Sequence, residues 1–281
     1  AMVIADTIAE AKDAAERIIV DYAELPVYLD TATANKPDTR RLWDDLPNNE
    51  PMFTEAGNVA AVEDAFKKAA HVVRGNFHVS RVAASTMEPR AVLATYDRGR
   101  DHIQIYACQQ RPYVWRQLLA DELFHIPETK ISLIAGDVGG SYGMKGGLYA
   151  EVVLVAWAAK KLARPVKWVC ERSEALICDD QARDMYVEDE LALDADGKFL
   201  AMRRTSNNNI GAYVTWLGFN STLGIAKNVV GTYTVPAVLG RAASVLTNTV
   251  PVSNYRAPGG APGAYAMERI VDMAAHQLGI D

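Results

Sequence analysis

The chain has 281 residues, of which 49% are apolar and 23% are charged, a composition typical of an ordinary globular protein with one or two domains. Its formal net charge of −6 disfavours nucleic acid as a partner, because binding to a phosphate backbone requires a basic surface. The sequence contains no apolar run of transmembrane length and no signal-peptide pattern, so we expect a cytoplasmic protein without a transmembrane segment.

The first segment, residues 1–34, is predicted to contain a strand, a helix and a second strand. Thr7 and Glu10 have the spacing of a capping box, which marks a helix start. The apolar runs at residues 1–5 and 18–22 are typical of strands. A unit of this size does not form a core by itself, so we interpret it as the tail of a larger domain.

A polar segment, residues 35–58, follows and is interrupted by prolines, which predicts a linker. Beyond it, helices and strands are interspersed without strict alternation, which favours an α+β, or mixed α/β, fold class. The predicted helices cover residues 60–70 and 113–124, a stretch ending near 163, and residues 264–278. The predicted strands cover residues 71–84, 91–96, 102–108, 131–135, 166–169, 185–194, 198–209 and a region within 232–249.

Two glycine-rich loops, Gly136–Gly147 and Tyr255–Gly263, each lead from a strand into a helix. Bare backbone amides in such loops can bind an anion at a helix start. The first loop matches neither the P-loop nor the dinucleotide-binding pattern, so the common nucleotide sites are unsupported. A tight structural turn is the alternative interpretation of this loop.

Polar side chains flank these loops. Arg256 can make bidentate bonds to phosphate or carboxylate, or it can pair with Glu268 or Asp272 within the chain. Gln109 and Gln110 follow a predicted strand, and their amides can bond a polar ligand or belong to an ordinary polar loop.

Other polar motifs give no independent sign of a catalytic or metal site. In Met87-Glu88-Pro89-Arg90 we expect an internal ion pair that shapes a turn. The five histidines and three cysteines lack the spacing of metal ligands, and no nucleophile motif is present.

Taken in order, the motifs resemble those of the large, molybdopterin-binding subunit of xanthine oxidase and aerobic carbon monoxide dehydrogenase-type hydroxylases. The motifs that carry the resemblance are Met87–Ala91, Gln110–Tyr113, Gly136–Lys145, Arg164–Trp168, Glu171-Arg172, Gln181–Asp184, Tyr255–Gly259 and Glu268–Asp272. They span nearly the whole chain.

The resemblance implies a domain organisation. Residues 1–34 would be the carboxy-terminal remnant of a small α+β hammerhead domain, residues 35–58 a linker, and residues 59–281 the first molybdopterin-binding domain. The family's second molybdenum-binding domain, which carries the glutamate general base, would lie beyond Asp281. We therefore expect no catalytic residue in this chain and no activity from the chain alone.

The resemblance also implies a function. The family hydroxylates an electron-poor carbon with water as the oxygen source, so the expected substrate is an aldehyde or an aromatic N-heterocycle. The expected cofactor is molybdenum–molybdopterin in its cytosine dinucleotide form, with the metal held by the pterin and by no protein ligand. Expected partners are an iron–sulfur subunit, an FAD subunit, and the rest of the large subunit or a second molybdopterin-binding subunit.

Roles are carried over by matching motif. Gln110 would approach the molybdenum ligands, and Arg256 would anchor the pterin. The expected cofactor-binding residues are Gln110, Gly140, Ser141, Tyr142, Gly143, Arg256 and Ala257.

Two departures from the family pattern matter. Ala257 stands where the copper–molybdenum enzymes carry a cysteine, so we do not expect carbon monoxide oxidation by that mechanism. Ser141-Tyr142 replaces the usual Gly-Phe and changes the polarity of the loop. The alternatives to an enzyme subunit are a non-catalytic scaffold or cofactor-binding protein of the same fold and an unrelated α+β binding module.

Overall fold

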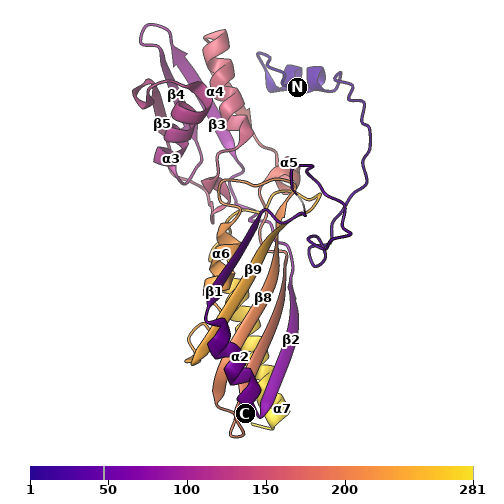
Figure 1. Ribbon diagram of the computed structural model, residues 1–281. Coiled ribbons are helices and arrows are strands. Elements are labelled where there is room, and N and C mark those ends of the chain that lie inside the picture. The colour runs from indigo at the N-terminus through magenta and orange to yellow at the C-terminus, as the bar shows by residue number, and fades with distance from the viewer. Residues whose placement is uncertain (47, 281) are drawn as a thin grey trace.

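The computed structural model describes residues 1–46 and 48–280. Pro47, in the predicted linker, and Asp281, at the end of the predicted cofactor-binding domain, lie outside the described residues. Figure 1 shows an elongated molecule with a sheet at each end. The amino-terminal segment curves out from the junction and returns beside the smaller sheet, where Asp6 pairs with Arg164 and Lys12 with Glu171. Each sheet contains both parallel and antiparallel pairs, which confirms the mixed α/β class.

The larger sheet has five strands in the order β1-β9-β8-β7-β2. All neighbouring pairs are antiparallel except β8 and β9, which the chain connects through the crossover helix α6 (Asn220–Lys227). The strands are β1 (Met52–Gly57), β2 (His71–Val79), β7 (Met185–Leu193), β8 (Phe199–Gly211) and β9 (Ala237–Leu246).

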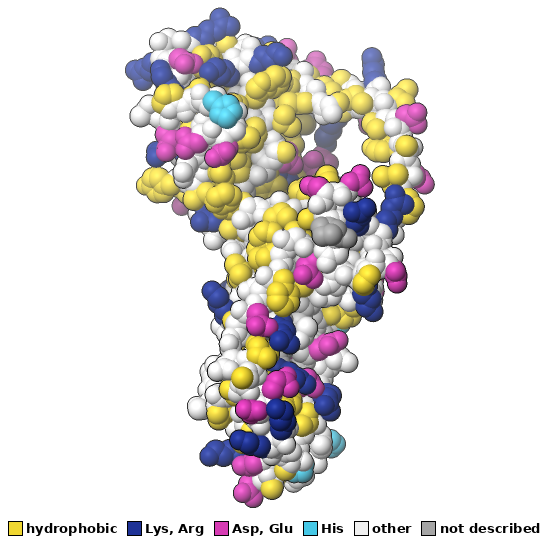
Figure 2. All heavy atoms as spheres, viewed as in Figure 1, with side chains coloured by type: hydrophobic (Ala, Val, Ile, Leu, Met, Phe, Trp, Pro, Cys, Tyr) yellow, Lys and Arg dark blue, Asp and Glu magenta, His cyan; other side chains and the backbone are white. Residues whose placement is uncertain are grey.

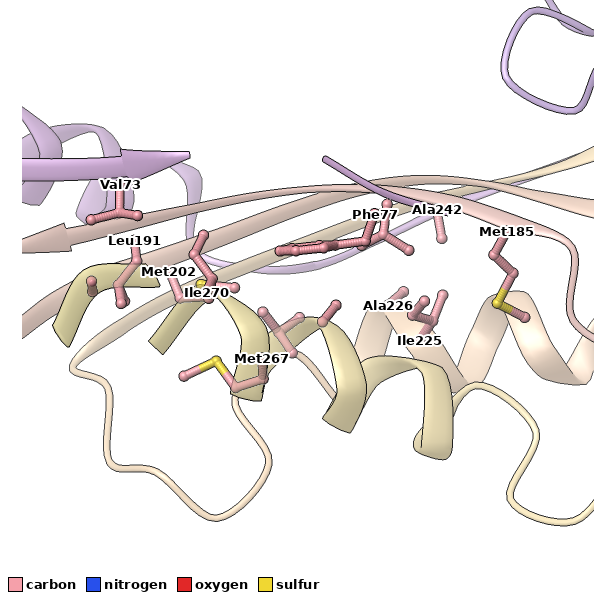
Figure 3. Close-up of a cluster of buried hydrophobic side chains, with 14 of the residues drawn as sticks. Val73, Phe77, Met185, Leu191, Met202, Ile225, Ala226, Ala242, Met267 and Ile270 are labelled. Atoms are coloured by element: carbon pink, nitrogen blue, oxygen red, sulfur yellow. The ribbon is translucent and has the colours of Figure 1, made fainter. Parts of the chain in front are cut away.

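Helices cover both faces of this sheet (Figure 1). α6 and the long carboxy-terminal helix α7 (Gly260–Leu278) pack on one face, and α2 (Val59–Lys68) packs on the other. Side chains alternate between the faces, so Leu191 lies under α7 while its neighbour Ala192 lies under α2. Figure 3 shows the main core under α6 and α7, where large apolar side chains of strands and helices interlock.

A buried ion pair lies within this core. Asp189 and Arg204 are direct cross-strand partners, and both side chains are fully buried. Both carboxylate oxygens of Asp189 accept hydrogen bonds of 2.7 Å from the Arg204 guanidinium, which also donates to the carbonyls of Asn228 and Gly263. Arg204 therefore joins β7 and β8 to the end of α6 and the first turn of α7.

The outer surface of this end is charged and mixed in sign. Figure 2 shows Lys and Arg side chains interspersed with Asp and Glu over it. Arg74, Glu190, Arg203 and Glu63 form one such network at the sheet surface. The more exposed pairs in it, such as Arg74–Glu190, contribute little to stability individually.

The smaller sheet has four strands in the order β5-β4-β3-β6. Its strands are β3 (Ala91–Asp97), β4 (His102–Ala107), β5 (Ile131–Ile134) and β6 (Val166–Val169). One face packs against the apolar helix α4 (Ala150–Leu162) and against α3 (Pro112–Gln117), which continues as the π-helix η1 (Leu118–Phe124). Two 3₁₀-helices, η2 (Glu128–Lys130) and η3 (Met144–Gly146), and the short α-helix α5 (Arg172–Cys178) complete this end.

The amino-terminal segment differs from its prediction. The capping box of Thr7 and Glu10 is present and starts α1 (Ile8–Ala15), as expected. The strands predicted at residues 1–5 and 18–22 were wrong, because neither stretch pairs with a described strand. A strand needs a ladder partner for its backbone groups, and local composition cannot supply one.

Several further elements were not predicted, among them one strand and two α-helices. β1 forms inside the segment interpreted as a linker, because pairing with β9 satisfies its backbone. α5 and α6 occupy stretches that gave no helical pattern. α7 starts at Gly260, inside the predicted second loop. Its first turn contains Pro262, which is tolerated because backbone N–H groups in the first turn of a helix make no hydrogen bond within the helix.

None of the helices in the described part of the chain combines the length and the apolar character needed to cross a bilayer.

We predict that Arg204→Met lowers the free energy of unfolding by about 3–5 kcal/mol, since it leaves the Asp189 carboxylate buried without its partner. The matched control is Arg241→Met, which removes an ion pair with Glu55 between half-exposed side chains and should cost about 1 kcal/mol or less. Urea unfolding of the chain followed by circular dichroism measures both. Equal losses in the two variants would contradict the structural importance of the buried pair.

Candidate functional site

The two glycine-rich loops meet at the junction between the sheets. The first loop follows β5 of the smaller sheet, and the second follows β9 of the larger sheet. The Arg256 amide donates a 2.7 Å hydrogen bond to the Tyr142 carbonyl. The rings of Tyr142 and Tyr255 meet edge to face, with centroids 6.3 Å apart. The sequence had singled out these loops separately, and the fold brings them into contact.

Gln110 joins the same group. The Ser141 hydroxyl donates a 2.6 Å hydrogen bond to the side-chain oxygen Oε1 of Gln110. The backbone N–H of Gln110 donates to the Lys145 carbonyl. Gln110, Tyr142 and Arg256 are exposed, as is Ala257, the next residue along the chain. The seven positions that the sequence selected therefore lie together: Gln110, Gly140, Ser141, Tyr142, Gly143, Arg256 and Ala257.

Gly143 lies where the first loop crosses Asn254, the residue that precedes the second loop. Its φ of +111° lies in the region that favours glycine, and a Cβ there would stand 2.7 Å from the Asn254 carbonyl oxygen. Only a residue without a side chain fits this crossing.

Three buried polar atoms in the segments that precede Gln110 and the second loop have no hydrogen-bond partner among the described residues. They are the side-chain amide nitrogen of Gln109, Ser253 Oγ and Asn254 Oδ1. Buried polar groups are normally bonded, so these atoms are suited to a polar ligand or an ordered water. The sequence gave Gln109 and Gln110 the same weight as amides and could not tell which would be buried.

Glu88 and Lys145 hold the first loop in place from behind. The Lys145 side chain is fully buried, and its ammonium donates to the Glu88 carbonyl at 2.8 Å and to the Glu88 carboxylate at 3.1 Å. The same carboxylate accepts the Gly139 amide at 2.8 Å. The loop conformation therefore depends on one carboxylate from the Met87–Arg90 motif.

The ion pair expected within that motif was wrong. Arg90 bonds instead to both oxygens of Glu151 and to Asp179, and its guanidinium stacks 3.8 Å from the Tyr149 ring centroid. Burial alone would lower the pKa of Arg90, but its bonds to Glu151 and Asp179 outweigh burial and raise that pKa above its usual value.

The intrachain partners considered for Arg256 were also wrong. Glu268 accepts a hydrogen bond from Tyr233, and Asp272 pairs with Arg269 one helical turn away. Both carboxylates lie on α7, while Arg256 precedes that helix.

Asp180 is a buried acid behind the first loop. Its carboxylate lies 3.8 Å from where a Cβ on Gly147 would stand, and its amide donates to the Tyr149 hydroxyl. Burial raises the pKa of Asp180 to about 7, against the opposing charge of Arg90. This residue was not among the sequence candidates, since burial of a carboxylate leaves no local sequence signal.

No group of three or more His, Cys, Asp or Glu side chains that could hold a metal ion occurs among the described residues. The donors at the site are instead amides, a hydroxyl and a guanidinium.

Comparison with known proteins identifies related sequences and structures. The family model of the molybdopterin cofactor-binding domain matches residues 42–281. The chain is 36% identical to the 6-hydroxypseudooxynicotine dehydrogenase complex subunit gamma of Paenarthrobacter nicotinovorans, over 96% of this chain and 33% of that protein. It is 32% identical to the carbon monoxide dehydrogenase large chain of Hydrogenophaga pseudoflava, over 100% of this chain and 37% of that protein.

Among solved structures, quinoline 2-oxidoreductase from Pseudomonas putida 86 superposes with a TM-score of 0.90 at 34% sequence identity. The match covers 99% of this chain and 35% of that one. The chain thus spans about a third of the length of the proteins that it matches.

We predict that Gly143→Ala destabilises the chain by about 1–3 kcal/mol, because alanine at this φ is strained and its methyl group meets the Asn254 backbone. Gly136→Ala in the same loop is the matched control, since nothing lies within 4 Å of a Cβ there, and its effect should stay within about 0.5 kcal/mol. Thermal unfolding of both variants checks this. A loss as large for Gly136→Ala as for Gly143→Ala would show that the crossing is not tight.

We predict that Asp180 makes stability depend on pH. The folded chain retains the Asp180 proton up to about pH 7, whereas the unfolded chain loses it near pH 3.8. The contribution of Asp180 to the free energy of unfolding therefore falls as pH rises from about 4 to 7. Asp180→Asn cannot ionise. The stability of the wild type relative to this variant should therefore decrease by up to about 4 kcal/mol from pH 4 to pH 7 and then level off. A difference that does not vary with pH in urea titrations would contradict the buried, protonated state.

Proposed function

Because this chain belongs to the family of molybdopterin cofactor-binding domains, we propose that it forms part of a molybdenum hydroxylase active site. The enzyme would hydroxylate an aldehyde or an aromatic N-heterocycle with water as the oxygen source. The observation that carries the proposal is the convergence of the two glycine-rich loops, joined by the Arg256–Tyr142 backbone bond.

The donors at this convergence fit a polar, anionic cofactor. Ser141 occupies the side-chain carbonyl of Gln110, which leaves the Gln110 amide nitrogen as a donor. The exposed Arg256 guanidinium is a planar donor suited to phosphate or oxo groups. The unpartnered Gln109 amide nitrogen and Asn254 oxygen add one donor and one acceptor near the same crossing.

We assign the holding of the cofactor to the seven residues that the sequence selected. Gln110 would contact the metal's oxygen ligands, Gly140 to Gly143 would lie against the pterin and metal centre, and Arg256 would anchor the pterin. Ala257 would face the substrate. When bound, the cofactor supplies the redox chemistry that these side chains lack, while the protein supplies position and electrostatics.

The proposed substrate class is supported by the names of the relatives. Quinoline is an aromatic N-heterocycle, and a second relative acts in a 6-hydroxypseudooxynicotine dehydrogenase complex. Ala257 has no ligand atom for copper, which disfavours a copper–molybdenum centre here.

We further propose that the chain acts within a cytoplasmic assembly. The relatives' names, a complex subunit and a large chain, support an enzyme of several subunits. Iron–sulfur and FAD subunits would carry electrons away, and the remaining part of the large subunit, or a second molybdopterin-binding subunit, would supply the glutamate general base. The cofactor would be the cytosine dinucleotide form, and the chain alone would be inactive.

Metal analysis of the native assembly that contains this chain tests the proposal. We expect about one molybdenum atom per chain, with iron and flavin in the same complex, and no stoichiometric cofactor on the isolated 281-residue chain. An assembly that lacks molybdenum would contradict the enzyme assignment and favour a scaffold of the same fold. Full molybdenum occupancy of the isolated chain would contradict its dependence on the rest of the enzyme.

We predict that Arg256→Ala lowers molybdenum content and that Gln110→Leu lowers turnover, each by roughly tenfold or more, because each removes a donor to the cofactor. The control Gln104→Leu changes the same residue type on β4, away from the loops, and should alter neither quantity. Mass spectrometry for molybdenum and steady-state turnover by the assembled enzyme provide the two measurements. Unchanged molybdenum content in Arg256→Ala and unchanged turnover in Gln110→Leu would show that neither residue contributes to the cofactor site.

A further inference from the structure

We propose that Arg183 is a positioning residue that fixes the backbone of Arg256 and Ala257 without touching the ligand. The proposal rests on the proposed function, because the loop that it fixes is the one assigned to the cofactor. Arg183 belongs to the Gln181–Asp184 motif, which the sequence analysis used for the resemblance and left without a role.

The contacts of Arg183 are unusual for a buried arginine. Its guanidinium donates to the Arg256 carbonyl at 2.9 Å and to the Ala257 carbonyl at 3.2 Å. It also lies 5.3 Å from the Tyr255 ring centroid. Arg90 and Arg204, by contrast, pair with carboxylates. Burial lowers the pKa of Arg183, and Tyr255 only partly offsets this. A buried cation is therefore committed to two consecutive carbonyls of one loop.

Backbone strain is concentrated around these contacts. Arg183, Asp184, Ala257 and Tyr142 have φ values of +68°, +59°, +57° and +55°, a conformation that residues with a Cβ seldom adopt. Such residues persist where the surrounding structure holds them. Asp184 is held by Arg81 and Asn209, and its neighbour Arg183 in turn holds Ala257.

Both backbone polar groups of Arg256 are thus hydrogen-bonded. Its amide donates to Tyr142, and its carbonyl accepts from Arg183, while its side chain is left exposed. These two bonds fix the backbone from which the exposed Arg256 side chain extends. A planar fork with two parallel donors can serve two neighbouring carbonyls at once, which the single ammonium of lysine does less well.

The test uses the full-length chain in its assembled enzyme, with Arg183→Lys and Arg183→Met. We expect faster hydrogen exchange at the backbone amides within residues 255–260, all but Pro258, in both variants, with exchange in β7 and β8 unchanged. Molybdenum occupancy should fall roughly tenfold in Arg183→Met and less in Arg183→Lys. The matched control is Arg203→Lys, whose partly buried guanidinium pairs with Glu190 and Glu63 away from the loops and should leave both measurements unchanged.

A second variant addresses the strain directly. Glycine adopts the left-handed conformation freely, so Ala257→Gly should recover part of the occupancy lost in Arg183→Met. Wild-type exchange at residues 255–260 in both Arg183 variants, faster exchange spread equally over β7 and β8, or an identical loss in the double variant would each overturn the proposal.

The exchange measurement separates this proposal from the proposed function. If the wild-type assembly holds no molybdenum, the proposed function fails. Faster exchange of residues 255–260 in the Arg183 variants would still show that Arg183 fixes this segment. If the wild type contains molybdenum and residues 255–260 stay protected in the variants, only the positioning role of Arg183 is contradicted.

Discussion

The hydrogen bond from the Arg256 amide to the Tyr142 carbonyl is the constraint from which the site geometry follows. It joins a loop that leaves the smaller sheet to a loop that leaves the larger one, so both sheets must be formed for the site to exist. Gly143 permits the approach, because any Cβ there would meet the Asn254 backbone. The exposed donors of Gln110 and Arg256 then lie beside neighbouring residues of the first loop, Ser141 and Tyr142.

Buried charges make the surroundings of this crossing rigid. Lys145 is committed to Glu88, Arg90 to Glu151 and Asp179, and Arg204 to Asp189. The pairs of Lys145 and Arg90 connect segments distant in sequence, while Arg204 and Asp189 lie opposite each other in the β7–β8 hairpin. Removing one member of a buried pair is costly, since the other is left without its partner, so these pairs favour one arrangement of the loops over alternatives. Arg183 differs because it uses its charge on backbone carbonyls and thereby fixes the loop itself.

Much of the fold could be predicted from local patterns. The β7–β8 hairpin, the apolar helix α4 and the capping box at Thr7 all agree with the structure, because alternation, helical apolar spacing and cap chemistry are local properties. β1 was missed and the strands at 1–5 and 18–22 were overpredicted for one reason. Whether an extended segment becomes a strand depends on a ladder partner that lies far away in sequence.

The sequence by itself determined the mixed α/β class, the two glycine-rich loops and, through the order of its motifs, membership of the molybdopterin-binding family. Only the tertiary structure decided that Lys145 is buried on Glu88, that Arg90 turns away from its neighbour Glu88, and that Arg183 bonds the second loop. The physical reason is that burial and pairing of a charge depend on which segments the fold brings together, and a side chain carries no local mark of its distant partner.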